Sequence, residues 1–156
     1  MGPNQASPDS HPDPARRRWM AVLARATAAE LGALVRAAGP PAYTVLRGPE
    51  GGLVMVRGRA GGGGAPFNLG EMTVTRCTVR TDAGQVGHAY VAGRDGTVAE
   101  LAALVDAMMQ DADRSPALDA QIIAPLEARQ KARQAERAGK AEATSVQFFA
   151  MQTMRT

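Results

Sequence analysis

Residues 70–93 read GEMTVTRCTVRTDAGQVGHAYVAG, and this stretch decides the fold. From Gly70 to Arg80, threonine and valine recur between longer side chains, which is typical of an extended strand with two different faces. Asp82, Ala83 and Gly84 follow as turn residues. The residues from Val86 to Gly93 then return as a second strand. The stretch therefore predicts a pair of antiparallel strands.

The segment before this stretch predicts a further hairpin. Residues 43–47 (YTVLR) and 53–59 (LVMVRGR) are rich in residues that favour strands, and residues 48–52 (GPEGG) carry a turn signal between them. The second part has apolar residues on both faces, with Leu53 and Met55 on one and Val54 and Val56 on the other. Such a strand is typically covered on both sides. Together the segments predict an antiparallel four-stranded sheet, with a five-stranded sheet as the alternative.

Two predicted helices precede the sheet and one follows it. The first begins at Pro14, and its apolar stripe consists of Trp19, Val22 and Leu23. The second opens with a capping box from Thr27 to Glu30 and ends at Gly39. Another capping box, from Thr97 to Glu100, opens a helix that runs to about Met109. The predicted fold class is therefore α+β, with the sheet packed by N-terminal and central helices.

The chain changes character after Ser115 and Pro116. A short apolar stripe ends at Leu126, and residues 125–143 are polar nearly all round, so a helix there cannot hold a core by itself. The apolar tail that follows must dock on its own sheet or on a partner. A solvated surface helix and an arm that crosses to another subunit both stay open. The candidate residues for a partner interface are Leu126, Val146, Phe148, Phe149 and Met151.

These features divide the chain into three parts. Residues 1–13 are polar and proline-rich and are expected to be a disordered extension, residues 14–116 form the α+β core domain, and residues 117–156 form a C-terminal helical arm and docking tail. The N-terminus lacks the hydrophobic centre of a signal peptide, and no apolar run approaches the roughly 20 residues that span a bilayer. The expectation is a soluble cytoplasmic protein without a membrane contact.

The composition argues for a protein partner and against nucleic acid. The net charge is +3, but the basic residues are dispersed among acids, and the stacking aromatics of a single-strand binder are missing. Hydrophobic residues make up 45% of the chain, yet its aromatics are three Phe, two Tyr and one Trp. Apolar burial per residue is therefore small. Such a domain gains stability by burying more surface against a partner.

Groups for catalysis or metal binding are scarce. The single Cys77 forms no internal disulfide, and the two histidines, His11 and His88, lie far apart in the sequence, so no metal-ligand cluster is expected. No serine-histidine or cysteine-histidine signature surrounds His88, which is expected to be a half-buried structural residue. Cys77 is expected to be a small hydrophobic residue of a strand. The chain is therefore expected to lack catalytic residues of its own.

Three arginines are the candidate anion site. Arg76 and Arg80 share one face of a predicted strand, and Arg94 lies in the loop after the next strand. Guanidinium groups so placed match the oxygens of a phosphate or phosphonate. Ion pairs of these arginines with Glu71, Asp82 and Asp95 are the alternative.

The order and spacing of several segments resemble the PhnG family, a subunit of the bacterial carbon–phosphorus lyase system for organophosphonates. The resemblance runs from about Arg17 to Met151. The segments that carry it are RRWMAVLARA, GLVMVRGRAGGGGAPFNLGEMTVTRCTVR, GHAYVAGRD, AELAALVDAMMQ, IIAPLE and SVQFFAMQ. None of them is a catalytic signature by itself.

The resemblance implies a supporting subunit of a multi-subunit complex. Its expected partners are PhnI, PhnH and PhnJ type subunits, assembled as a symmetric dimer of such sets. In that pathway the PhnG, PhnH, PhnI and PhnL subunits attach an alkylphosphonate to C1 of the ribose of ATP and displace adenine. ATP and the phosphonate are then substrates of the complex, and this chain binds no cofactor. A stand-alone cytoplasmic domain that binds an anion or nucleic acid is the alternative.

Overall fold

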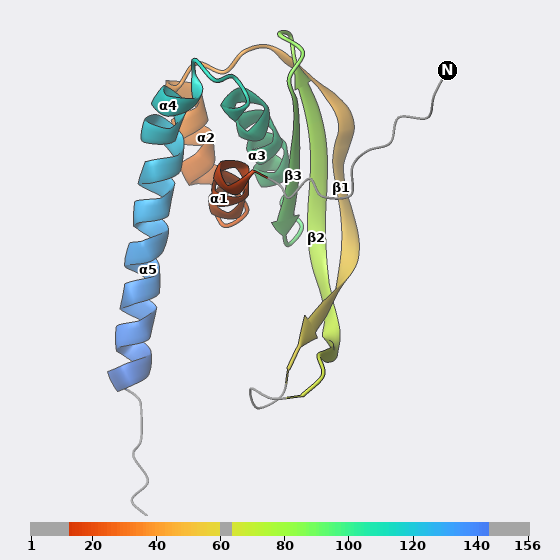
Figure 1. The fold of residues 1–156 in the computed structure, drawn as a ribbon, viewed down its shortest axis with the longest axis vertical. Coiled ribbons are helices and arrows are strands. Elements are labelled where there is room, and N and C mark those ends of the chain that lie inside the picture. Colours follow the sequence, from red (N-terminus) through yellow and green to blue (C-terminus); the bar gives the residue numbers. More distant parts are fainter. Residues whose placement is uncertain (1–12, 60–63, 144–156) are drawn as a thin grey trace, which may run out of the picture.

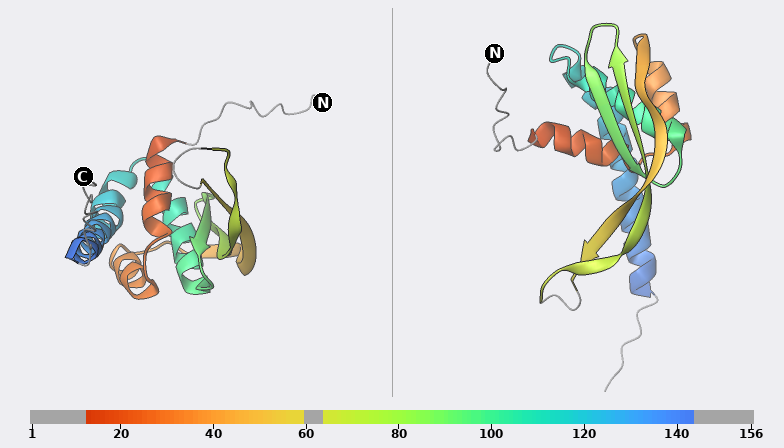
Figure 2. Two further views of the ribbon diagram at one scale, coloured as in Figure 1. Left: turned by 90° about the horizontal axis from the view of Figure 1, so that it is seen from below. Right: turned by 90° about the vertical axis from the view of Figure 1, so that its right-hand side faces the viewer.

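A computed structural model of the chain describes residues 13–59 and 64–143. The elements follow in the order α1 (Pro14–Leu23), α2 (Ala28–Ala37), β1 (Tyr43–Gly58), β2 (Phe67–Thr81), β3 (Val86–Ala92), α3 (Gly96–Met109), α4 (Ser115–Leu118), the π-helical turn η1 (Asp119–Ile123) and α5 (Ala124–Ala143). The sheet is one layer, α3 lies against one of its faces, and α1 and α2 separate α3 from α5 (Figure 1; Figure 2, left). The predicted α+β class is confirmed. Within the described part, no helix has the length and apolar character needed to cross a membrane.

The sheet has three strands in the order β1-β2-β3, and the prediction of four or five strands is corrected for the described residues. Residues 48–52 do not form a turn, because β1 continues through them and pairs with β2 on both sides. A tight hairpin turn needs positive φ angles, and none of the three glycines in this segment has one. The extra residues form irregularities instead. Val45 pairs with Val79 and Arg47 with Thr78, which leaves Leu46 as a bulge.

The pairing of β2 with β3 agrees with the prediction. Their register places Arg76 opposite Tyr90 and Thr78 opposite His88. Gly84 has a φ of 93° in the turn between the strands, a conformation that glycine adopts without a steric penalty. This part of the sheet was predictable because its turn and its alternation are local properties of the sequence.

The capping of the helices agrees with the sequence at α2 and differs at α3. At α2 both hydrogen bonds of the box from Thr27 to Glu30 are present. At α3 the predicted box from Thr97 to Glu100 is wrong, because Asp95 is the N-cap and its carboxylate accepts a hydrogen bond from Val98 N. Glu100 instead accepts a hydrogen bond of 2.7 Å from the Tyr43 hydroxyl, which links α3 to the start of β1.

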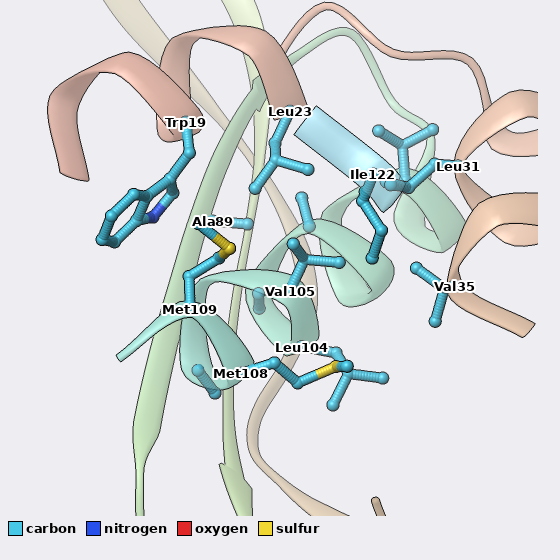
Figure 3. Packing of buried hydrophobic residues seen from close by; sticks show 14 of the residues in the cluster. Trp19, Leu23, Leu31, Val35, Ala89, Leu104, Val105, Met108, Met109 and Ile122 are labelled. Carbon is cyan, nitrogen blue, oxygen red and sulfur yellow. The ribbon is translucent and has the colours of Figure 1, made fainter. Parts of the chain in front are cut away.

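The core lies around α3, which is apolar on nearly all sides because it packs between the sheet and the other helices (Figure 3). Small residues let α3 approach the sheet closely. A Cβ built on Gly87 of β3 would lie 2.0 Å from the carbonyl oxygen of Ala103, so only glycine fits there. The larger buried side chains around α3 include Trp19, Leu23, Leu31, Val35 and Ile122.

The first part of the predicted C-terminal arm belongs to this core. Leu118, Ile122, Ile123 and Leu126 are all buried. The helix also continues past Pro125, which has no backbone N–H to donate. The π-helical turn η1 ends two residues before this proline and widens the helix where the pyrrolidine ring would meet the preceding turn.

Candidate functional site

The reactive side chains that the sequence offers do not come together. Cys77 is buried and donates a hydrogen bond to the carbonyl oxygen of Arg47, and burial raises the pKa of its thiol. His88 is exposed rather than half-buried, and its ring contacts the Thr78 hydroxyl at 3.1 Å. Thr78 pairs with His88 across the sheet, and Cys77 and Thr78 are successive residues of β2. The Cys77 thiol and the His88 ring therefore lie on opposite faces of the sheet. Nor do the described residues contain a cluster of three or more histidine, cysteine or acidic side chains fit to hold a metal.

The three candidate anion-binding arginines are divided between the two faces of the sheet. Arg76 and Arg80 alternate with the buried residues of β2 and therefore lie on the outer face, away from α3. Arg76 lies 3.3 Å from Glu50, an acid that the sequence interpretation had not paired with it. Arg94 lines a hollow on the helix side together with Thr73 and Thr75. The structure does not unite the three arginines in one site.

Asp106 organises a polar network that sequence reasoning missed. Its carboxylate is fully buried and accepts hydrogen bonds from Arg16 Nε and Nη2, from Trp19 Nε1 and from the backbone N–H of His88. This pairing raises the pKa of the Arg16 guanidinium, against the opposing effect of burial. The network joins α1, β3 and α3. Asp106 therefore positions the first helix and has no face open to a ligand.

The sheet has a two-stranded extension whose edges are unpaired among the described strands. Strand β3 pairs only with Val74–Arg80 of β2, whereas β1 and β2 continue to pair with each other beyond it. We call this extension, Leu53–Gly58 with Phe67–Thr73, the ribbon. It projects below α1, α2, α3 and β3, to about the level that the lower end of α5 reaches (Figure 1; Figure 2, right). A two-stranded ribbon is marginally stable in water by itself.

The ribbon exposes large apolar side chains. The exposed fractions are 64% for Leu53, 60% for Leu69, 53% for Met55, 46% for Phe67 and 42% for Met72. Among the described residues, the prediction that this part of β1 is covered on both sides is wrong, because β3 and the helix packed on the sheet, α3, end before they reach it (Figure 1). An exposed apolar surface concentrated on one projection is typical of a binding surface.

Within the part of the chain that the structure describes, both faces of the ribbon carry exposed side chains and both of its edges are unpaired. Leu53 pairs with Thr73 and Met55 with Glu71 on the helix side, while Val54 pairs with Met72 on the outer side. No other described strand pairs with either edge of the ribbon, so backbone N–H and C=O groups are open to an added strand. The ribbon can therefore be enclosed by a partner on several sides.

A hollow of about 490 Å³ lies at the base of the ribbon. Leu53 forms part of its wall, together with Arg94 and the irregular segment of β1. Its remaining lining residues are Pro49, Gly51, Gly52, Thr73, Thr75 and Gly96. A pocket beside an exposed apolar surface is a common place for an anchoring side chain of a partner.

The interface candidates chosen from the sequence lie elsewhere. Leu126 is fully buried in the core of this chain and has no surface to offer a partner. Val146, Phe148, Phe149 and Met151 lie outside the described residues. In the sequence, the ribbon is visible as the apolar residues on both faces of residues 53–56. The sequence-based interpretation assigned these residues to a strand covered on both sides.

Comparison with known proteins identifies similar chains. The model of a family described as phosphonate metabolism protein PhnG matches residues 14–154. A protein of Rhizobium meliloti (strain 1021), described as alpha-D-ribose 1-methylphosphonate 5-triphosphate synthase subunit PhnG, is 47% identical over 140 residues. That similarity covers 87% of this chain and 87% of the relative.

Proposed function

Because the chain belongs to the PhnG family of phosphonate metabolism proteins, we propose that it is a supporting subunit of an alpha-D-ribose 1-methylphosphonate 5-triphosphate synthase. The 47% identity, which extends over 87% of both chains, carries this proposal. The protein is thus one component of a multi-subunit assembly in phosphonate catabolism.

The reaction of the assembly joins a phosphonate to the ribose of ATP. A phosphonate oxygen forms a bond to C1 of the ribose, the bond from C1 to adenine breaks, and adenine leaves, which yields a ribose 1-alkylphosphonate 5-triphosphate. Catalysis of such a displacement needs groups that stabilise charge at C1 and on the leaving base. The scattered positions of Cys77, His88 and Arg94 support a non-catalytic role for this chain.

We propose that the ribbon docks on the catalytic partners, which are PhnI, PhnH and PhnJ type subunits arranged as a symmetric dimer of such sets. Support comes from the exposed Leu53, Met55 and Leu69, which a stable interface would remove from water. Since the assembly consumes ATP, the cytoplasm is its proposed location.

Reconstitution tests the proposal. The PhnH, PhnI and PhnL type subunits, with and without this chain, are mixed with ATP and methylphosphonate, and adenine release is measured by chromatography. The expected result is release only when the chain is present and none from the chain alone. Full activity of the partners without the chain contradicts the proposal, and so does turnover by the chain alone.

A further inference from the structure

A second polar feature is a groove between the end of α1 and the outer helix α5 (Figure 1). The groove has a volume of about 530 Å³, within the roughly 300–1,000 Å³ of small-molecule sites. Arg25, Gln130, Arg133, Gln134 and Arg137 line it. Three guanidinium groups and two side-chain amides thus face one concave surface.

The positive charge of this groove is only partly compensated. Arg133 Nη1 lies 2.7 Å from Glu30 Oε1, and this contact lowers the pKa of Glu30. Arg25 and Arg137 form no ion pair with any described acid. The groove therefore has a surplus of positive charge that favours an anion.

The spacing along α5 increases this surplus. Arg129, Arg133 and Arg137 follow one another at intervals of four residues, so like charges are neighbours on the helix surface. By contrast, Lys131 and Lys140 each form an ion pair with a glutamate four residues earlier. Like charges at this spacing destabilise a helix slightly, and a bound anion removes that cost.

The walls of the groove are held in place. The side-chain amide of Gln130 donates to the carbonyl oxygen of Val22 at 2.8 Å, which fixes α5 to the end of α1. The contact of Arg133 with Glu30 fixes α5 to α2. The arginines are therefore presented by a preformed surface, which lowers the entropic cost of binding.

We propose that this groove binds the 5-triphosphate chain of ATP or of the ribosyl product. Guanidinium forks match phosphate oxygens in geometry and charge, and three of them suit a run of linked phosphates better than one isolated anion. The concave shape and the added amide donors favour a small polyanion over an acidic segment of a partner protein. The inference rests on the proposed function, since the synthase reaction supplies the triphosphate.

Calorimetric titration of the full chain with inorganic triphosphate and with ATP, at low salt, tests the site. Arg25→Gln and Arg137→Gln are each expected to weaken both ligands about tenfold, the loss of one charge-assisted hydrogen bond. Lys131→Gln is the matched control, because Lys131 has the same charge on the same helix, does not line the groove and is 74% exposed. This control is expected to bind within about twofold of the wild type, as befits a screened surface charge.

Three outcomes overturn the inference. The first is no triphosphate binding by the wild type, and the second is an equal loss of binding in all three variants. The third is that the wild type binds no triphosphate while Arg25→Gln and Arg137→Gln lose capture of the partner subunits. That result would assign the groove to an acidic segment of a partner. The two proposals fail separately. A chain that the synthase requires but that does not bind triphosphate contradicts the groove alone. Triphosphate binding by a chain that the synthase does not need contradicts the proposed function alone.

Discussion

Arg16 and Asp106, 90 residues apart in the sequence, form a two-point ion pair with distances of 3.1 and 2.7 Å. The pair fixes α1 on α3, and the same carboxylate also receives the indole N–H of Trp19. Asp106→Asn removes the charge and leaves these donors poorly paired in a buried place. The free energy of unfolding is expected to fall by about 2–4 kcal/mol, as for the loss of one partner of a buried pair.

Urea unfolding followed by circular dichroism measures this loss. Asp119→Asn is the control, because Asp119 pairs with Arg18 at the surface, where an ion pair contributes about 1 kcal/mol or less. Equal losses in the two variants would show that Asp106 has no special structural role.

The close approach of β3 to α3 predicts the effect of a single added methyl group. Gly87→Ala places a Cβ 2.0 Å from the Ala103 carbonyl oxygen, so the strand and the helix must separate. The expected loss of stability is about 1–3 kcal/mol, the usual cost of overpacking. Gly51→Ala, in a strand position with nothing within 4 Å of the added Cβ, is expected to lose no stability. Thermal unfolding compares the two, and a Gly87→Ala protein as stable as the wild type would refute the close packing.

The hydrogen bond between Tyr43 and Glu100 predicts an alkaline transition. Hydrogen bonding to Glu100, then burial, raises the pKa of Tyr43 to about 12. In the unfolded chain this phenol ionises near pH 10, so its contribution to stability is complete below pH 10 and is lost between pH 10 and about 12. Ultraviolet absorbance should show one of the two tyrosines titrating late.

Glu100→Gln removes the carboxylate and is expected to bring the Tyr43 pKa down toward its usual value. Two tyrosines that titrate together near pH 10 in the wild-type protein would contradict the burial and pairing of Tyr43.

The ribbon is predicted to matter for assembly and little for the fold. Leu53→Ser and Met55→Ser change side chains that are 64% and 53% exposed, so the stability of the chain alone should change by no more than about 0.5 kcal/mol. Co-purification with the partner subunits should nevertheless be lost, because the change places hydroxyl groups in an apolar interface. Tyr90→Ser, at a 50% exposed position outside the ribbon, is the control that should retain the partners. Equal retention by all three variants would exclude the ribbon as the docking surface.

Features that depend on neighbouring residues were predictable from the sequence, and features that depend on long-range contacts were not. The turn at Gly84 and the capping box at Thr27 depend on neighbouring residues, and both were predictable. Residues 48–52 have the composition of a turn, but the long partner strand β2 holds them extended, which no local pattern reveals. The role of Asp106 depends on partners up to 90 residues away.

For the candidate sites too, the sequence shows the local pattern and only the fold shows the long-range contacts. The apolar residues of the ribbon were visible as a pattern, but their exposure depends on where β3 and the helices end. Arg25 lies in the turn after α1 and Arg137 lies on α5, and only the docking of α5 against the end of α1 brings them to one groove. Their charges therefore looked dispersed along the chain.

Adenine release from ATP and methylphosphonate measures whether this chain completes a synthase through its ribbon. Four samples of the PhnH, PhnI and PhnL type subunits are compared: without the chain, with the wild type, with Leu53→Ser/Met55→Ser, and with Tyr90→Ser. Release is expected with the wild type and with Tyr90→Ser, and background levels are expected in the other two samples. Release that is equally fast without the chain, or with the ribbon double variant, would contradict this expectation.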